Sequence, residues 1–193
     1  MNIKRILLIF LIVVALVAVF AVLIKKEIND IKTDPIFENY KIPANSMAPT
    51  IQKGDRIIAN LNYYQSFSPK RGDIVIFHAR NIKKLPSKKH FIKRIVAFPG
   101  ETVEIKDPHI YINNKKLTEP KIFLDHKYTG KIPEWNYGTT GKPVRVPEGH
   151  YFVLGDNSFN SNDSRHWGFV PMESVLGRGL RIYWPPSRMG VIE

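Results

Sequence analysis

Phe91-Ile92-Lys93-Arg94-Ile95-Val96 indicates the fold, because it is short and rich in β-branched residues, as strands are. Six further segments share this character: 55–59, 73–77, 102–105, 110–112, 151–154 and 180–184. Asn113-Asn114 follows one of them and predicts a hairpin turn. No segment after residue 26 keeps an apolar period of 3.6, and 13 of the 14 prolines lie after residue 40. We therefore predict a mainly β domain, a folded β-sheet or barrel.

The bounds of the β domain, and of an insertion within it, follow from where the strand-like segments lie in the sequence. We expect the β domain to occupy residues 38–193, preceded by a polar tether at 25–37. Within the domain, residues 118–148 have a loop-like sequence that is typical of an insertion between strands.

The amino-terminal segment has a different character. Residues 6–24 form an unbroken apolar run of 19 residues between Lys4-Arg5 and Lys25-Lys26. As a helix the run is about 28 Å long, close to the roughly 30 Å hydrocarbon core of a bilayer. The apolar region of a cleaved secretory signal is shorter, about 7–15 residues. The sequence therefore predicts one transmembrane signal anchor at 6–24. Because basic residues flank both ends, charge alone leaves its orientation open. The resemblance described below implies that residues 1–5 are a short cytoplasmic stub.

Composition excludes several chemistries. The chain has no cysteine, so disulfides, thiolate metal sites and cysteine nucleophiles are ruled out. No histidine pair has the helical spacing of a zinc site. A calcium loop starting at Asp156 would place Ser161 where glycine is needed and Trp167 where a bidentate glutamate belongs. We expect no metal and no cofactor.

A basic run adds to the net charge of +12. Lys83, Lys84, Lys88 and Lys89 lie within seven residues, but no nucleic-acid motif accompanies them. Anionic lipid headgroups are the nearer partner for a membrane-anchored chain, and a solvated loop is the simpler alternative.

One cation of the opening stretch is a candidate for catalysis. Lys93 and Arg94 are adjacent in a strand and point to opposite faces, so one of them is a candidate for the buried face. Burial disfavours a lysine ammonium, and a shift of its pKa to near neutrality costs about 3–4 kcal/mol. The neutral amine can then take a proton from a serine. Ser46, on a segment constrained by Pro43 and Pro49, is a candidate for that serine, although such segments are often inert turns.

Four blocks that include these residues carry a family resemblance. In order they are Ser46-Met47-Ala48-Pro49-Thr50-Ile51, Gly72-Asp73-Ile74-Val75, Lys93-Arg94-Ile95-Val96-Ala97-Phe98-Pro99-Gly100, and the run from Gly155-Asp156-Asn157 to Asp163-Ser164-Arg165. Together with the anchor they resemble the bacterial type I signal peptidases, and the match runs to about residue 184.

The resemblance implies an activity and a location. The β domain would lie outside the cytoplasmic membrane, held there by a single-pass anchor. It would act as a serine endopeptidase that removes signal peptides from exported preproteins, with cleavage after small residues in an Ala-x-Ala pattern. The implied partners are preprotein signal peptides and membrane lipids. We expect a monomer and no nucleic-acid partner.

The resemblance also assigns roles to residues. Ser46 would be the nucleophile and Lys93 the general base, and Ser161 would form a hydrogen bond with Lys93. Asp163 and Arg165 would form an ion pair that holds the same loop. Further residues of this loop expected to shape the wall of the site are Asp156 and Asn157.

The oxyanion site departs from the family pattern. Many members carry Ser or Thr two residues before the nucleophile, where this chain has Ala44. The Ser46 backbone N–H remains as an oxyanion donor, and Asn45 is a second candidate. The loss of one such donor costs about 2.7–4 kcal/mol, which predicts slow turnover or an altered substrate range. Ile42 and Met47 flank the nucleophile and are candidates for lining the pockets that select alanine.

Two alternatives remain open on sequence alone. One is a Ser–Lys maturation peptidase of a transfer or secretion system, which would differ only in its substrate. The other is a non-catalytic, membrane-tethered β module that binds peptides.

Overall fold

The computed structural model describes residues 13–14, 16–19, 34–131 and 136–192. The chain divides into two units, 1–34 and Pro35–Glu193. In the first unit, residues 13–14 and 16–19 are helical. Within the described part of the chain, no helix has both the length and the hydropathy needed to cross a bilayer. The span predicted at 6–24 lies mostly outside the described residues, so it stays a prediction.

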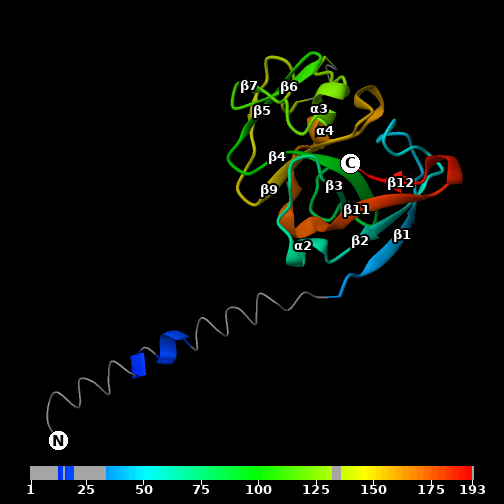
Figure 1. Cartoon of the computed structure of the whole chain (residues 1–193). Helices are drawn as coiled ribbons and strands as arrows, with labels where there is room; N and C mark the ends of the chain where they lie inside the picture. The colour runs from blue at the N-terminus through cyan, green and yellow to red at the C-terminus, as the bar shows by residue number, and fades with distance from the viewer. Residues whose placement is uncertain (1–12, 15, 20–33, 132–135, 193) are drawn as a thin grey trace, which may run out of the picture. The chain divides into compact units, whose positions relative to one another are not determined.

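The second unit is built on an eight-stranded sheet in which every pair is antiparallel (Figure 1). The strand order is β1-β2-β11-β3-β4-β9-β10, with β12 beside β11. The bounds are β1 (Phe37–Lys41), β2 (Arg56–Asn60), β3 (Ile74–His78), β4 (His90–Ala97), β9 (His150–Leu154), β10 (Val170–Pro171), β11 (Val175–Trp184) and β12 (Gly190–Val191). The predicted mainly β fold is confirmed.

A second sheet has the order β7-β6-β5-β8 and is also antiparallel. Its strands are β5 (Thr102–Lys106), β6 (His109–Ile112), β7 (Lys115–Lys116) and β8 (Val144–Arg145). Asn113 and Asn114, both at positive φ, form the predicted turn between β6 and β7. In Figure 1 this sheet lies together with α3 (Ile122–Asp125), to one side of the larger sheet.

The described helices of this unit are all short, as the lack of a helical period predicts. Besides α3 they are α2 (Tyr63–Ser66), α4 (Ser164–Trp167) and the 3₁₀ turns η1 (Ser158–Asn160), η2 (Met172–Ser174) and η3 (Pro186–Arg188). The first turn of α4 is capped by Asp163, whose side chain accepts a hydrogen bond from the Arg165 N–H.

The segment 118–148 contributes to the core although its sequence is loop-like. It contains α3 and β8, and Phe123, Tyr128 and Val146 are buried in the cluster that also holds strand residues of β5 and β6. Burial of these side chains ties the segment to the second sheet.

A separate apolar cluster lies beneath the loop that follows β1. Met47 and Ile51 of this loop are fully buried against Ile57 of β2 and Ile74 of β3. These contacts fix the backbone on either side of residue 46, because a packed core tolerates little displacement of its side chains.

Candidate active site

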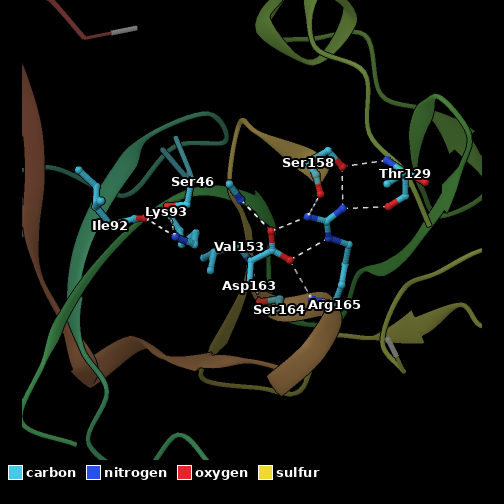
Figure 2. A network of polar contacts seen from close by, with 10 residues as sticks. Ser46, Ile92, Lys93, Thr129, Val153, Ser158, Asp163, Ser164 and Arg165 are labelled. Atoms are coloured by element: carbon cyan, nitrogen blue, oxygen red, sulfur yellow. Dashed lines mark hydrogen bonds and ion pairs between the residues drawn. The ribbon is translucent and has the colours of Figure 1, made fainter. Parts of the chain in front are cut away.

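Ser46 and Lys93 meet in the structure although 47 residues separate them in sequence (Figure 2). Lys93 Nζ lies 3.0 Å from Ser46 Oγ, and it donates a second hydrogen bond of 2.9 Å to the Ile92 carbonyl. Ser46 lies in the turn after β1, and Lys93 lies in β4. The distance suits direct proton transfer between hydroxyl and amine.

The environment of Lys93 favours the neutral amine. The side chain is 3% exposed. Burial lowers the pKa of Lys93 from 10.5 to about 8, while Asp163 and Asp156 oppose this change and Arg165 adds to it. A general base whose pKa is close to the pH of its surroundings is poised for proton transfer.

Arg94 corrects one part of the sequence interpretation. One of the two adjacent cations was predicted to be buried, but both are, since Arg94 is 0% exposed. Arg94 forms a bidentate pair with Asp156, with Nε to Oδ1 at 2.8 Å and Nη2 to Oδ2 at 2.6 Å. Thr50 donates a further hydrogen bond of 2.5 Å to the same carboxylate. The arginine is buried because the carboxylate compensates its charge.

The turn that carries Ser46 is held by hydrogen bonds from two sides. The Asn157 N–H donates to the Ser46 carbonyl at 3.2 Å, and Asn157 Nδ2 donates to the Asn45 carbonyl at 3.1 Å. Asn45 Oδ1 accepts from the Lys53 N–H at 2.8 Å. Asn157 thus supports the Ser46 turn through hydrogen bonds, and neither it nor Asp156 is among the residues that line the cavity of Ser46 and Lys93. The Asn45 side-chain oxygen accepts a hydrogen bond within the loop itself.

Gly155 allows this close approach. A Cβ atom at this position would lie 2.3 Å from the Ser46 carbonyl oxygen and 2.2 Å from Ser161 Oγ. Both separations are far shorter than van der Waals contact, so only glycine fits here without displacing its neighbours.

The expected ion pair between Asp163 and Arg165 is present and fully buried, with Nη2 to Oδ2 at 2.7 Å. Arg165 also donates to Ser158 Oγ and to the carbonyls of Ser158 and Thr129, as Figure 2 shows. Asp163 Oδ2 accepts the Gly155 N–H at 3.0 Å. The pair therefore connects the 158–165 loop to the glycine that contacts Ser46.

Ser161 does not form the expected hydrogen bond with Lys93. Its Oγ is buried and has no hydrogen-bond partner within the described residues. The hydroxyl lies against Gly155, whereas Lys93 Nζ is directed to Ser46 and the Ile92 carbonyl. Ser161 is thus buried against Gly155 and is not bonded to the amine.

Ser46 and Lys93 open into a cavity of about 520 Å³, here called the catalytic groove. Its lining is Ile42, Pro43, Ala44, Ser46, Lys84, Leu85, Pro86, Lys89, His90, Phe91, Ile92, Lys93, Asn160 and Asn162. Ile42 therefore lines the groove, although it is only 4% exposed. Met47 does not, because it is fully buried in the apolar cluster beneath the loop.

Metal ligands are not grouped in the part of the chain that the structure describes. No three His, Asp or Glu side chains there approach one another closely enough to hold an ion. The chemistry available from the described residues is a hydroxyl beside a buried amine.

Comparison with known proteins agrees with this geometry. A family model described as "Signal peptidase, peptidase S26" matches residues 3–184, nearly the whole chain. The chain belongs to the S26 signal peptidase family. Within the match lie the Ser46 turn, β4 and the 155–165 loop that build the site.

Individual relatives of this S26 chain carry the same description. The probable signal peptidase I-2 of Synechocystis sp. is 41% identical over 152 residues, which cover 78% of this chain and 65% of that protein. Signal peptidase I T of Bacillus subtilis is 39% identical over 155 residues, 80% of this chain and 77% of the relative. A crystal structure of a signal peptidase I from Enterococcus faecalis V583 aligns at 35% identity with a TM-score of 0.44, over 58% of this chain and 97% of that one.

Proposed function

We propose that this S26 peptidase is a membrane-bound serine endopeptidase that removes signal peptides from exported preproteins, with Ser46 and Lys93 as its catalytic dyad. The observation that carries the proposal is the 3.0 Å contact between Ser46 Oγ and the buried Lys93 amine inside the catalytic groove. The names of the relatives, signal peptidase I, supply the substrate class.

The chemistry proceeds in two halves. Neutral Lys93 takes the proton of Ser46 Oγ as that oxygen attacks the scissile carbonyl, and it returns the proton to the amine that leaves with the mature protein. A water then gives one proton to Lys93 and its hydroxide to the acyl carbon. As the ester bond breaks, Lys93 passes that proton to Ser46 Oγ, which restores the serine and the neutral amine, and the signal peptide leaves as a carboxylic acid that ionises in water. No cofactor takes part in these steps.

A strand edge in the groove suits an extended peptide. On one edge β4 pairs with β9, but only from Arg94 onward. Residues 90–93 therefore have no partner strand on this edge among the described residues. The Ile95 N–H donates to Asp73 on the opposite edge. Since the edges alternate along a strand, the backbone groups of Ile92 face the groove. A substrate could add there as a strand, with its main chain bound and its side chains read by pockets.

The Ser46 N–H is the proposed oxyanion donor. It donates no hydrogen bond to any described residue, so it is available to the tetrahedral intermediate. Ala44 lines the groove and contributes no hydroxyl. Asn45 Oδ1 is engaged with the Lys53 N–H, which leaves its amide nitrogen as the second candidate donor.

The remaining parts of the proposal concern placement. Residues 6–24 would be a single-pass anchor in the cytoplasmic membrane, with 1–5 inside, 25–37 as tether and the β domain at 38–193 outside. The anchor would hold the groove at the lipid surface where signal peptides end, which raises the local concentration of cleavage sites. Ile42 would limit the groove to small side chains, and the enzyme would act as a monomer.

The proposal is tested with the detergent-solubilised full chain and a preprotein that carries an Ala-x-Ala site. We expect one cut after the second alanine, located by mass spectrometry, and its loss in Ser46→Ala and in Lys93→Met. Ser87→Ala and Lys88→Met are matched controls, since both residues are exposed and neither lines the groove. Cleavage that persists in both dyad variants, or peptide binding without any cut, would refute the proposal.

A further inference from the structure

The basic run of the sequence lies beside the dyad. Residues 79–89 connect β3 to β4, and this connection contributes four residues to the lining of the catalytic groove: Lys84, Leu85, Pro86 and Lys89. The lysines therefore belong to the same cavity as Ser46 and Lys93, although the sequence alone fits a solvated loop.

The connection has a defined conformation. Ile82 is 5% exposed and packs in an apolar cluster of β3, β4 and β9 residues, against which Leu85 also packs. The Ala79 N–H donates to the Lys89 carbonyl at 3.2 Å, which closes the loop at its base. Lys84 Nζ donates to the His166 carbonyl at 3.1 Å. The loop thus holds its two groove-lining lysines on a packed base.

The charges along the groove are of one sign. Besides Lys93, whose amine is neutral in the proposed mechanism, Lys84 and Lys89 line it, and no aspartate or glutamate does so among the described residues. Neither Lys84 nor Lys89 forms an ion pair with a described carboxylate. Both residues are solvent-exposed and line the groove, so their positive charge contributes to the electrostatic potential there.

We propose that Lys84 and Lys89 form a substrate-selecting rim that favours preproteins with an acidic side chain near the cleavage site. The proposal rests on the peptidase function proposed above. Lys89 precedes Lys93 by four residues along the chain into β4, a separation of about 13 Å at roughly 3.3 Å per residue. A peptide extended along this edge therefore places its acidic residue three or four positions from the scissile bond.

An anionic lipid headgroup would be a second source of negative charge. The peptide is favoured because these lysines line the cavity that holds the dyad, where a bound headgroup would compete with the substrate for the same space. The other two lysines of the run, Lys83 and Lys88, do not line the groove and provide a comparison within the same loop.

The test uses the full chain in neutral detergent and synthetic Ala-x-Ala peptides in which one aspartate is moved through the positions on both sides of the cleavage site. We expect aspartate at one position, three or four residues from the cut, to raise kcat/KM roughly twofold to fivefold over asparagine, as for an exposed ion pair. The preference should disappear near 1 M salt, where the screening length is about 3 Å.

Variants assign the preference to the rim. In Lys84→Gln/Lys89→Gln the aspartate-to-asparagine ratio should fall to about one, and Lys89→Glu should invert it in favour of a lysine peptide. Lys83→Gln/Lys88→Gln, which removes the same charge from the same loop, should keep the ratio. A ratio of one in the unaltered enzyme, or a ratio that survives in Lys84→Gln/Lys89→Gln, overturns the proposal.

Two further outcomes are separable. If the asparagine peptide is cut in a Ser46-dependent way but no charge preference exists, the rim proposal fails and the peptidase proposal stands. If no peptide is cut, the peptidase proposal fails first. Lysine-dependent binding to vesicles of anionic phospholipid, without any peptide preference, would assign the rim to lipid and refute the selection of substrates.

Discussion

Lys93 and Arg94 are neighbours in β4 that point to opposite faces, and both are buried, but only Arg94 has a carboxylate in contact with it among the described residues. Lys93 contacts a hydroxyl and a backbone carbonyl. An arginine paired with Asp156 stays charged, whereas a lysine without such a partner loses much of its preference for the ammonium form. The strand thus places a structural cation and the proposed catalytic amine side by side.

The rate should depend on pH through the Lys93 amine. Its pKa is about 8, and the proposed mechanism requires the neutral form. We expect log kcat/KM to rise with unit slope up to about pH 8 and then to level off. The measurement is a pH profile on a peptide without groups that titrate between 5 and 10, with circular dichroism to show that the fold persists. A plateau that is already complete at pH 6 would contradict the assignment of Lys93.

Removal of the amine should stabilise the fold. The pKa of Lys93 is about 8 when folded and 10.5 when unfolded, so at pH 7 the folded state holds a poorly solvated ammonium. Lys93→Met should therefore raise the free energy of unfolding at pH 7 by up to about 3 kcal/mol, at 1.36 kcal/mol per unit. The difference in the free energy of unfolding between Lys93→Met and the parent should narrow as the pH rises from 8 to 10.5, because the amine becomes neutral in both the folded and the unfolded state.

Urea unfolding at several pH values checks this prediction. Lys88→Met is the control, since Lys88 is exposed and its replacement should change the free energy of unfolding by less than about 0.5 kcal/mol. A Lys93→Met variant less stable than the parent at pH 7 would show that the hydrogen bonds of the amine outweigh its desolvation.

Gly155→Ala should disable the site through a steric clash. The new Cβ would lie 2.3 Å from the Ser46 carbonyl oxygen, so the turn that carries the nucleophile must move. A displacement of about 1 Å can reduce the rate about 100-fold, and overpacking should lower the free energy of unfolding by about 1–3 kcal/mol. Gly190→Ala is the control, because a Cβ at residue 190 meets no atom within 4 Å. Equal kcat values for the two variants would be incompatible with the close approach described here.

Asp163→Asn should cost more stability than any exposed ion pair. The substitution leaves the Arg165 guanidinium buried at 0% exposure without its carboxylate, a change that costs about 3–5 kcal/mol. Lys121→Gln, which breaks the exposed Lys121–Asp125 pair, should change stability by less than about 0.5 kcal/mol. Chemical denaturation of both variants compares them, and similar losses would show that the buried pair is not needed to hold the loop.

The sequence predicted what depends on local pattern. β4 and β9 were recognisable from their β-branched and aromatic residues, and the turn at Asn113 and Asn114 from its residue types. The two-residue strands β7, β8, β10 and β12 were missed, because their pairing is set by the strands beside them and such short segments carry no period of their own.

The site was predictable in part from local pattern and in part from the family resemblance. Local pattern offered Ser46 and Lys93 only as candidates, and the resemblance assigned their roles and supplied the Asp163–Arg165 pair. The pair between Arg94 and Asp156 was not foreseen, because 62 residues separate its members and nothing local marks them as partners. The hydrogen bond expected of Ser161 failed for a related reason, since the direction of a buried hydroxyl depends on packing against residues such as Gly155.

Residues 90–93 of β4 have no partner strand on one edge among the described residues, and this has a consequence for association between copies of the chain. A strand edge that can pair with an extended substrate can also pair with another copy of the same protein. Association of β proteins often begins at such exposed edges. Lysines along such a border discourage that contact, since two identical positive surfaces repel each other. The positive charge of the lysines beside this edge would thus keep copies of the enzyme apart. Replacing these lysines with neutral residues should make an otherwise well-folded protein associate.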